Sequence, residues 1–199
     1  MFSIVIPIFD EAQNIEALVD EILNSLKDYN DFEVILVNDS STDNTIDLVC
    51  ALKKKFNILL INNPKKNGQS FCIHKGVLES KNNTIVTIDG DGQFLPEEIP
   101  KLVKKIESNE ADVVIGYRFD GAAEMPNYRK FGNKMLDKMA NMVTEMAVSD
   151  TQSGFRAYSK NIIKLIDFKK KGFGADTEIL ISAAKNGARI SEEKVSVIY

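Results

Sequence analysis

Short runs of β-branched residues alternate with helical patterns from residue 2 to residue 117, and this alternation constrains the fold most. Strands are predicted at residues 2–7, 32–38, 57–62, 84–89 and 112–117. Because most of these runs are apolar without interruption, they favour a parallel sheet that is covered by helices on both faces. The covering helices are predicted at residues 15–27, 42–55, 68–80 and 96–107. The sequence therefore predicts an α/β fold.

The helix starts and the second half of the chain are less regular. The second helix is expected to begin at Thr42 or Asp43, with Ser41 or Thr42 as its N-cap, and Pro96 opens the fourth. The remaining residues predict a long helix, a loop with a short strand, a helix and a closing strand, at 127–148, 149–158, 176–186 and 188–198. With 199 residues and no linker or repeat, one domain is expected.

Composition excludes several classes of protein. The net charge of −4 argues against a general nucleic-acid binder. Cys50 and Cys72 lie in predicted helices without a CxxC motif, so neither a zinc site nor a disulfide framework is expected. No apolar run reaches the length of a membrane span, and the first residues do not form a signal peptide. We expect a cytoplasmic protein. The lysine clusters at 53–55, 65–66 and 169–171 are interpreted as solvated loops or helix ends.

Polar loops follow three of the predicted strands. Residues 7–11 follow the first strand, residues 38–43 the second and residues 89–93 the fourth, and each loop carries carboxylates. In open parallel sheets, ligands bind beyond the carboxyl ends of the strands, where the strand order reverses. We therefore expect these loops to converge on one site.

The third loop is the sharpest signal. In an extended segment, residues two apart point the same way, so Asp89, Asp91 and Gln93 can present two carboxylates and an amide to one spot. Gly90 and Gly92 let a ligand approach the backbone. Hard oxygen ligands of this kind suit Mg²⁺ or Mn²⁺, although an Asp/Gly turn without a metal is a common alternative. A cation here would stabilise the charge on a departing diphosphate.

The first two loops would then hold a nucleoside. Asp39 can accept a hydrogen bond from a ring N–H of the base, Phe9 can pack against the base or ribose, and Glu11 can reach its polar edges. The alternatives remain open at this point. Phe9 fits a core residue, Glu11 a charge in the first turn of a helix, and Asp39 a turn residue.

Several segments resemble the family-2 glycosyltransferases, and within them the group of dolichol-phosphate mannose synthases and dolichol-phosphate glucose synthases. The resemblance covers nearly the whole chain and lies in VIPIFDEAQNI, VNDSSTD, DGDGQ, GYR and SDTQSGFRAY, which begin at residues 5, 37, 89, 116 and 149. It implies a Rossmann-like glycosyltransferase A-type domain. Residues 1–117 would form the nucleotide-binding half, and residues 118–199 the acceptor-binding half.

The resemblance also assigns residues to the site. It implies a metal bound by Asp89, Asp91 and Gln93, and catalytic roles for Asp91 and Arg118. The implied contacts with the nucleotide-sugar are Pro7, Phe9, Glu11, Val37, Asp39, Asp89, Gly90, Asp91, Gln93 and Arg118.

The chain departs from the family pattern at several positions. Phe9 stands where the family commonly has Tyr, and Asn38 and Ser40 flank Asp39 in place of Asp and Gly. Residues 67–70 lack a glycine and an arginine that are often present. Because of these changes, the resemblance does not define which nucleotide-sugar is the donor. The chain also stops at Tyr199, before a basic stretch of the family pattern, so a native protein that continues past Tyr199 is one interpretation.

An acceptor phosphate is already ionised and needs cations rather than a base. Arg118, Arg129 and Arg156 are candidates because a guanidinium matches phosphate oxygens, and Ser153 is grouped with them. Arg156 is equally well interpreted as a residue that organises its loop. An acceptor hydroxyl would instead require a base. Asp176 is the best candidate for that role, and the N-cap of the following helix is its alternative interpretation.

The long predicted helix suggests a contact with a membrane. Lysines and methionines form separate lines along it, at positions 130, 134 and 138 and at positions 135, 139, 142 and 146. Such a helix can lie on an anionic membrane, or its methionines can pack into the domain. The loop at residues 119–127 is interpreted as a lid over the acceptor.

The leading hypothesis is inverting, metal-dependent transfer of mannose or glucose from a GDP- or UDP-linked donor to a polyprenyl or dolichyl phosphate. One alternative is a glycan hydroxyl acceptor with Asp176 as the base. Another is a non-catalytic domain that binds nucleotide-sugars. A pyrophosphorylase is discounted because residues 7–14 contain no glycine, lysine or arginine. The expected location is the cytoplasm, at the cytoplasmic face of a membrane.

Overall fold

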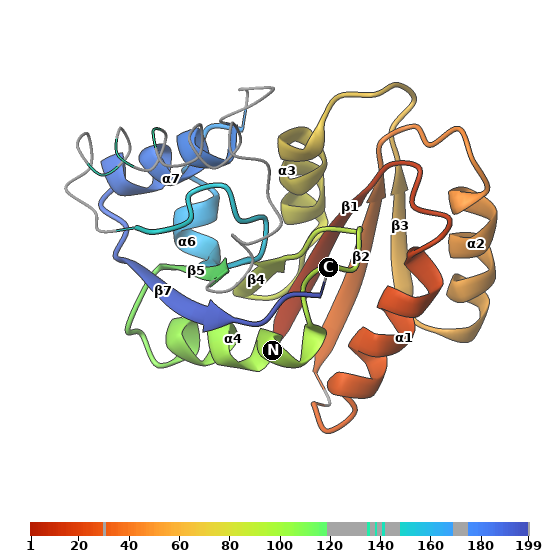
Figure 1. The fold of residues 1–199 in the computed structure, drawn as a ribbon, viewed down its shortest axis with the longest axis horizontal. Coiled ribbons are helices and arrows are strands. Elements are labelled where there is room, and N and C mark those ends of the chain that lie inside the picture. The colour runs from red at the N-terminus through yellow and green to blue at the C-terminus, as the bar shows by residue number, and fades with distance from the viewer. Residues whose placement is uncertain are drawn as a thin grey trace.

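A central sheet organises the computed structural model, which describes residues 1–29, 31–118, 135, 138, 141, 148–168 and 175–198. The strands are β1 (Phe2–Ile8), β2 (Phe32–Asn38), β3 (Ile58–Asn62), β4 (Thr84–Thr87), β5 (Val113–Arg118), β6 (Arg156–Ser159) and β7 (Ile190–Val195). They form one sheet in the order β3-β2-β1-β4-β6-β5-β7 (Figure 1). Every pairing is parallel except the two made by β6, so the predicted, mostly parallel α/β fold is confirmed.

The topology places the carboxyl ends of three strands at a switch point. The chain runs outward from β1 through β2 to β3, then returns to the other side of β1 with β4. In the register, Ile8 of β1 lies beside Asn38 of β2, and Val5 lies beside Thr87 of β4. The segments that leave these strands therefore start side by side, as ligand sites in such sheets require.

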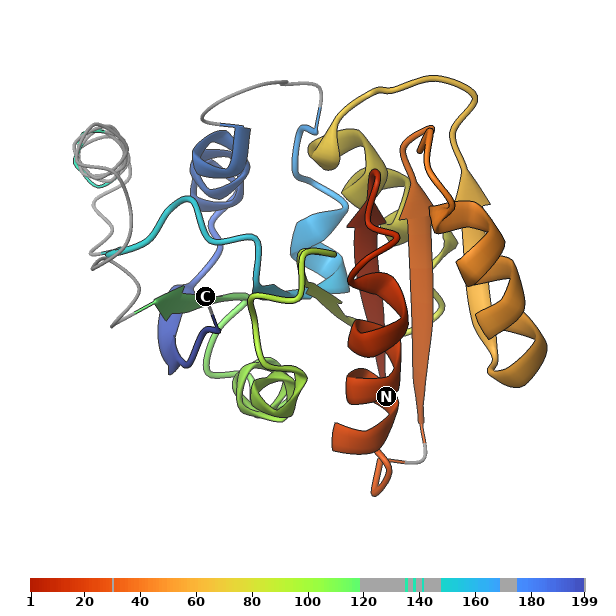
Figure 2. The same cartoon turned by 45° about the vertical axis from the view of Figure 1, so that its right-hand side comes forward.

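Helices cover both faces of the sheet. They are α1 (Ile15–Ser25), α2 (Thr45–Lys55), α3 (Gln69–Glu79), a 3₁₀ turn η1 (Pro96–Glu98), α4 (Ile99–Glu107), α6 (Lys160–Ile163) and α7 (Ala175–Lys185). Buried residues of α1, α2 and α4 pack on one face, and those of α3, α6 and α7 pack on the other. In Figure 2, the green helix α4 lies below the sheet and the blue helix α7 above it.

The strand β1 shows why its sequence is apolar throughout. Ile4 and Ile6 face the α1 side, Val5 faces the α3 side, and all three are fully buried. The helix α3 comes so close to β1 that a Cβ at Gly76 would lie 2.3 Å from Cγ1 of Val5. A glycine is needed there for close packing of helix on strand.

Several predicted boundaries differ from the structure. The helix α2 begins at Thr45 rather than at Thr42 or Asp43, so neither Ser41 nor Thr42 is its N-cap. Both residues are used elsewhere, because Ser41 Oγ donates to Asn38 Oδ1 and Thr42 N donates to Asp10 Oδ1. The bond from Thr42 to Asp10 ties the loop after β2 to the loop after β1.

The second half contains further differences. The predicted short strand is β6, but it is antiparallel to both neighbours, and α6 follows it without having been predicted. The closing strand is shorter than 188–198, with an isolated bridge from Val197 to Phe94 beyond it. The predicted lid at 119–127 and most of the predicted helix at 127–148 lie outside the described residues. Within that helix, Met135, Lys138 and Asn141 are described as helical, and Met135 and Lys138 are exposed.

Within the described part of the chain, no helix has the length and apolar character needed to cross a membrane.

Candidate active site

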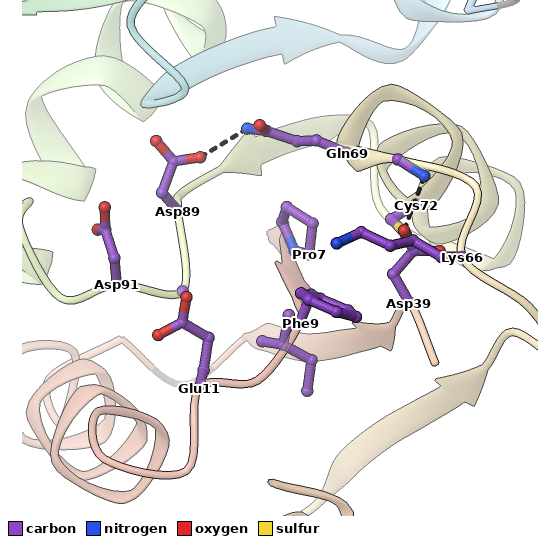
Figure 3. A pocket seen from close by; sticks show the side chains of 12 residues that line it. Pro7, Phe9, Glu11, Asp39, Lys66, Gln69, Cys72, Asp89 and Asp91 are labelled. Atoms are coloured by element: carbon purple, nitrogen blue, oxygen red, sulfur yellow. Dashed lines mark hydrogen bonds between the residues drawn. The ribbon is translucent and has the colours of Figure 1, made fainter. Parts of the chain in front are cut away.

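The three polar loops converge on one cleft, as predicted. Its volume is about 320 Å³, and it opens at the carboxyl ends of β1, β2 and β4. The lining residues come from the end of β1, from the loops after β1, β2, β3 and β4, and from the start of α3: Pro7, Ile8, Phe9, Glu11, Asp39, Lys66, Gly68, Gln69, Cys72, Asp89, Gly90 and Asp91 (Figure 3). Seven of the residues predicted to contact a nucleotide-sugar are among them: Pro7, Phe9, Glu11, Asp39, Asp89, Gly90 and Asp91.

Carboxylates gather on one wall of this cleft. Figure 3 shows Asp89, Asp91 and Glu11 on the same side, with the carboxylates of Asp89 and Asp91 pointing in a similar direction. Burial, together with the nearby charges of Asp91 and Asp176, raises the pKa of Asp89 to about 7. Burial also raises the pKa of Glu11, and the charge of Asp91 adds to that effect. Accumulated negative charge of this kind fits a site that binds a cation.

The donor set suits a hard divalent ion that completes its shell with substrate oxygens. Among the described residues, no group of three or more His, Cys, Asp or Glu side chains is arranged to enclose a metal. Mg²⁺ is usually held by one or two protein carboxylates, with waters and substrate phosphates in the remaining positions. Asp89 and Asp91 fit that pattern. Gln93 donates its backbone N–H to Asp91 Oδ1 at 3.1 Å, which orients that carboxylate.

Asp89 is fixed by its neighbours. Gln69 Nε2 donates to Asp89 Oδ1 at 2.7 Å from the start of α3. The carboxylate also rests against Gly154, where a Cβ would lie 2.2 Å from Asp89 Oδ1. Thr87 Oγ1 holds Gly154 in place by donating to its carbonyl at 2.8 Å. The segment that contains Gly154 therefore shapes the site.

Phe9 and Lys66 lie across the cleft from Asp91 (Figure 3). Phe9 is partly exposed, so it is not the core residue of the alternative interpretation. The Nζ atom of Lys66 lies 3.2 Å from the centroid of its ring, within the range of a cation–π contact. Val37 was also predicted to contact the nucleotide, but its side chain is fully buried in the core on the α3 side. A side-chain contact from Val37 is therefore ruled out in this arrangement.

The carboxylate of Asp39 binds the loop before α3. It accepts hydrogen bonds from the backbone N–H of Asn67 at 2.9 Å and of Gly68 at 2.7 Å, and from Asn63 Nδ2 at 3.0 Å. Burial raises the pKa of Asp39, but these hydrogen bonds outweigh that effect, so its pKa lies below the usual range. A base N–H would have to compete with these donors.

The predicted acceptor residues are mostly paired within the protein. Arg118 forms a two-pronged ion pair with Asp150, with distances of 2.8 Å from Nε and 3.0 Å from Nη2. Arg156 is fully buried and donates to the carbonyls of Thr151 at 2.9 Å and Asp176 at 3.1 Å. Arg156 thus organises its loop, and the structure does not expose it to an acceptor phosphate.

Ser153 is likewise an internal residue rather than an exposed phosphate contact. It is fully buried, and its hydroxyl donates to the carbonyl of Gly116 at 2.7 Å. Asp176 lies within the first turn of α7, so it is not the N-cap. Burial raises the pKa of Asp176, and the guanidinium of Arg156 opposes that shift. Arg129 lies outside the described residues.

Comparison with known proteins identifies the family. The model of the family described as "Glycosyl transferase family 2" matches residues 3–166. The chain belongs to glycosyl transferase family 2. It is therefore a glycosyltransferase, and the resemblance seen in the sequence is confirmed.

Curated relatives are similar over most of this family-2 chain. A dolichol-phosphate mannosyltransferase of Pyrococcus furiosus is 33% identical over 90% of this chain, which spans only 52% of that protein. A UDP-N-acetylglucosamine–dolichyl-phosphate N-acetylglucosaminyltransferase of Methanococcus voltae is 29% identical over 100% of this chain and 86% of its own.

A solved structure supports the fold. Glucosyl-3-phosphoglycerate synthase of Mycobacterium tuberculosis, in complex with Mn²⁺, UDP and phosphoglyceric acid, has a TM-score of 0.73 and 18% identity. The match covers 96% of this chain and 67% of that one.

The sequence analysis of this family-2 domain missed six residues of the site, which are Ile8, Lys66, Gly68, Gln69, Cys72 and Gly154. Lys66 was interpreted as part of a solvated cluster, and Gln69, Cys72 and Gly154 were given no role. Cys72 and Gln69 both lie in a helical pattern that faces the cleft only because α3 packs on β1 and β2. No local signal in the sequence marks them. Gly154 stood within a motif, but its contact with Asp89 depends on the antiparallel strand β6.

Proposed function

We propose that this domain transfers a hexosyl group, mannose or glucose, from a GDP- or UDP-linked donor to a polyprenyl or dolichyl phosphate, with inversion and with Mg²⁺ or Mn²⁺. The observation that carries the proposal is the placement of Asp89 and Asp91 on one wall of an open cleft at the switch point of the sheet. This is where a nucleoside diphosphate and a divalent ion would meet.

The metal would be held by Asp89 and Asp91, with Gln93 beside them. When bound, it would supply positive charge that stabilises the leaving diphosphate. Phe9 offers a ring face to the nucleoside, and Pro7 and Glu11 line the same cleft.

The names of two relatives support the acceptor. Both the Pyrococcus and the Methanococcus protein are named for a dolichol or dolichyl phosphate, although the sugars differ. A phosphate oxygen is already ionised at neutral pH, so it attacks the sugar without a general base. Because this acceptor is a lipid, the domain would work at the cytoplasmic face of a membrane. Arg118 and Arg129 are the candidates to hold the acceptor phosphate.

The placement of Asp176 favours one second candidate, a hydroxyl acceptor. Asp176 lies close enough to Asp89 for its charge to raise the pKa of that carboxyl, and its own pKa is raised mainly by burial. A carboxylate with a raised pKa beside the reacting group is suited to act as a base. Asp176→Asn separates the two candidates. Transfer to a hydroxyl should fall by about a hundredfold or more, whereas transfer to a phosphate should persist.

The direct test is an assay of sugar transfer by the purified domain. GDP-mannose, UDP-glucose and UDP-N-acetylglucosamine are each incubated with a short polyprenyl phosphate in detergent, with Mn²⁺ or with EDTA. We expect one donor to give a polyprenyl-phosphate sugar, and only with the metal. Transfer that is unaffected by EDTA, or that occurs only to hydroxyl acceptors, would contradict the proposal.

A further inference from the structure

The donor cleft contains one positive charge from the described part of the protein. Of the twelve described residues that line it, Lys66 alone has a cationic side chain, whereas Glu11, Asp39, Asp89 and Asp91 are acidic. A nucleoside diphosphate brings further negative charge into this space. A metal on the Asp89 wall offsets part of that charge, and the opposite wall has Lys66 for the same purpose.

The lysine is held where an arriving nucleotide must meet it. Its Nζ lies 3.2 Å from the centroid of the Phe9 ring, and in Figure 3 the amine end points into the cleft beside Pro7. A base that stacks on Phe9 must displace this amine. Lys66 is exposed and has a long flexible stem, so displacement is easy and leaves the charge next to the bound ligand.

The backbone that carries Lys66 does not share this freedom. The next residue, Asn67, donates its backbone N–H to both oxygens of Asp39, at 2.9 and 3.1 Å, and Gly68 donates to the same carboxylate. The loop is therefore fixed to the end of β2 while the side chain of Lys66 can move. A fixed backbone that carries a movable cationic side chain allows the cation to change its partner when the ligand binds.

We propose that Lys66 binds the diphosphate of the donor, and that its position on Phe9 is its resting place in the absence of donor. This proposal rests on the proposed function, because it assumes a nucleoside diphosphate sugar as the donor. Lys66 exchanges a cation–π contact for an ion pair with phosphate oxygens. The same exchange uncovers the ring of Phe9 for the base, so binding of the base and of the phosphates is coupled through one side chain.

The test compares a nucleoside with its diphosphate. Dissociation constants of guanosine, GDP, uridine and UDP are measured by calorimetry with Mg²⁺ for the wild type, Lys66→Met and Lys65→Met. Methionine retains the length of the stem without its charge, and Lys65 is an exposed neighbour that does not line the cleft. The measured quantity is the gain in affinity from nucleoside to nucleoside diphosphate.

We expect Lys66→Met to reduce this gain by about tenfold, which is roughly 1.4 kcal/mol, because it removes a charge-assisted contact, and to leave nucleoside binding unchanged or stronger. Lys65→Met should retain the gain of the wild type. The proposal is overturned if Lys66→Met reduces the gain by less than threefold, or if both variants reduce it equally. Absence of nucleotide binding in the wild type would instead refute the donor-binding function as a whole.

Discussion

Two polar regions of this protein look similar in sequence and differ in what their side chains do. The loops after β1, β2 and β4 present Glu11, Asp89 and Asp91 to an open cleft. The segment 148–156 is just as rich in polar residues, but its side chains bind other parts of the protein. Ser149 donates to Glu192, and Ser153 donates to Gly116. The first region is built to bind a ligand, and the second is built to support it.

The two regions meet at Asp89. Its carboxylate lines the cleft and also rests against Gly154 of the supporting segment. Arg156 of the same segment lies near enough for its charge to lower the pKa of Asp89, although burial and neighbouring acids outweigh this. The comparison teaches that polar residues in a motif divide into ligand contacts and internal supports, and that burial with internal pairing separates the two.

The largest effect should come from the open region. Asp91→Asn should reduce sugar transfer by at least about a hundredfold in kcat, because it would remove a carboxylate that we propose to hold the metal at the leaving diphosphate. Asp91 is exposed, so the melting temperature of the variant should stay close to that of the wild type. Glu97→Gln, which alters another exposed acid after β4, is the control. Activity of Asp91→Asn within tenfold of the wild type would contradict the assignment.

The supporting region should show its effect on stability. Arg156→Met leaves the carbonyls of Thr151 and Asp176 without their buried partner, which should cost about 3 kcal/mol, or roughly 6–12 °C in melting temperature. Arg189→Met removes an exposed guanidinium paired with Asp112 and should lower the melting temperature much less than Arg156→Met does. If Arg156→Met retained full stability and only raised KM for the acceptor, Arg156 would be a ligand contact and the division would fail.

Asp89, shared by both regions, gives the site a pH dependence. Its pKa is raised to about 7 by burial and then by Asp91 and Asp176, so the protonated form is favoured below pH 7. A divalent ion binds the ionised carboxylate and must displace this proton. Affinity for Mn²⁺ should therefore rise about tenfold per pH unit up to about pH 7 and then level off. Calorimetric titrations between pH 5.5 and 8 test this, and a flat profile would show that Asp89 has an ordinary pKa.

The same shift affects the metal-free protein. Because the folded state raises the pKa of Asp89 above its ordinary value of 3.8, the fold loses stability as pH rises from that value to about 7. Added Mn²⁺ should consequently raise the melting temperature more at pH 8 than at pH 5.5.

The sequence was informative about the open region for a physical reason. Buried parallel strands give uninterrupted apolar runs, and the residues directly after them must lie at one edge of the sheet. Asp89 and Asp91 could be placed by that rule alone. That rule does not apply to the motif that begins at residue 149, because it leads into β6, which is antiparallel to its neighbours. In this arrangement Ser153 and Arg156 are buried.

Local sequence patterns also could not predict contacts between residues that are far apart in the sequence. Asp39 was expected to bind a base, but its oxygens accept the N–H groups of Asn67 and Gly68, 28 and 29 residues further along the chain. The loop before α3 has no periodicity that would predict such bonds. For the same reason, Lys66 was interpreted as a solvated charge. Local sequence cannot distinguish a lysine over a cleft from one in open water.

The smallest predicted effect tests whether α3 also supports the site. Gln69→Ala removes the 2.7 Å hydrogen bond to Asp89 Oδ1. Because this hydrogen bond is exposed, it contributes only about 0.5–1.5 kcal/mol. Mn²⁺ affinity should fall by about threefold, and stability should hardly change because alanine suits the first turn of a helix. Gln13→Ala, an exposed glutamine outside the cleft, is the matched control. An equal response in both variants would mean that Asp89 is positioned by the Gly154 side alone. A selective loss in Gln69→Ala would extend the supporting region across the cleft to α3.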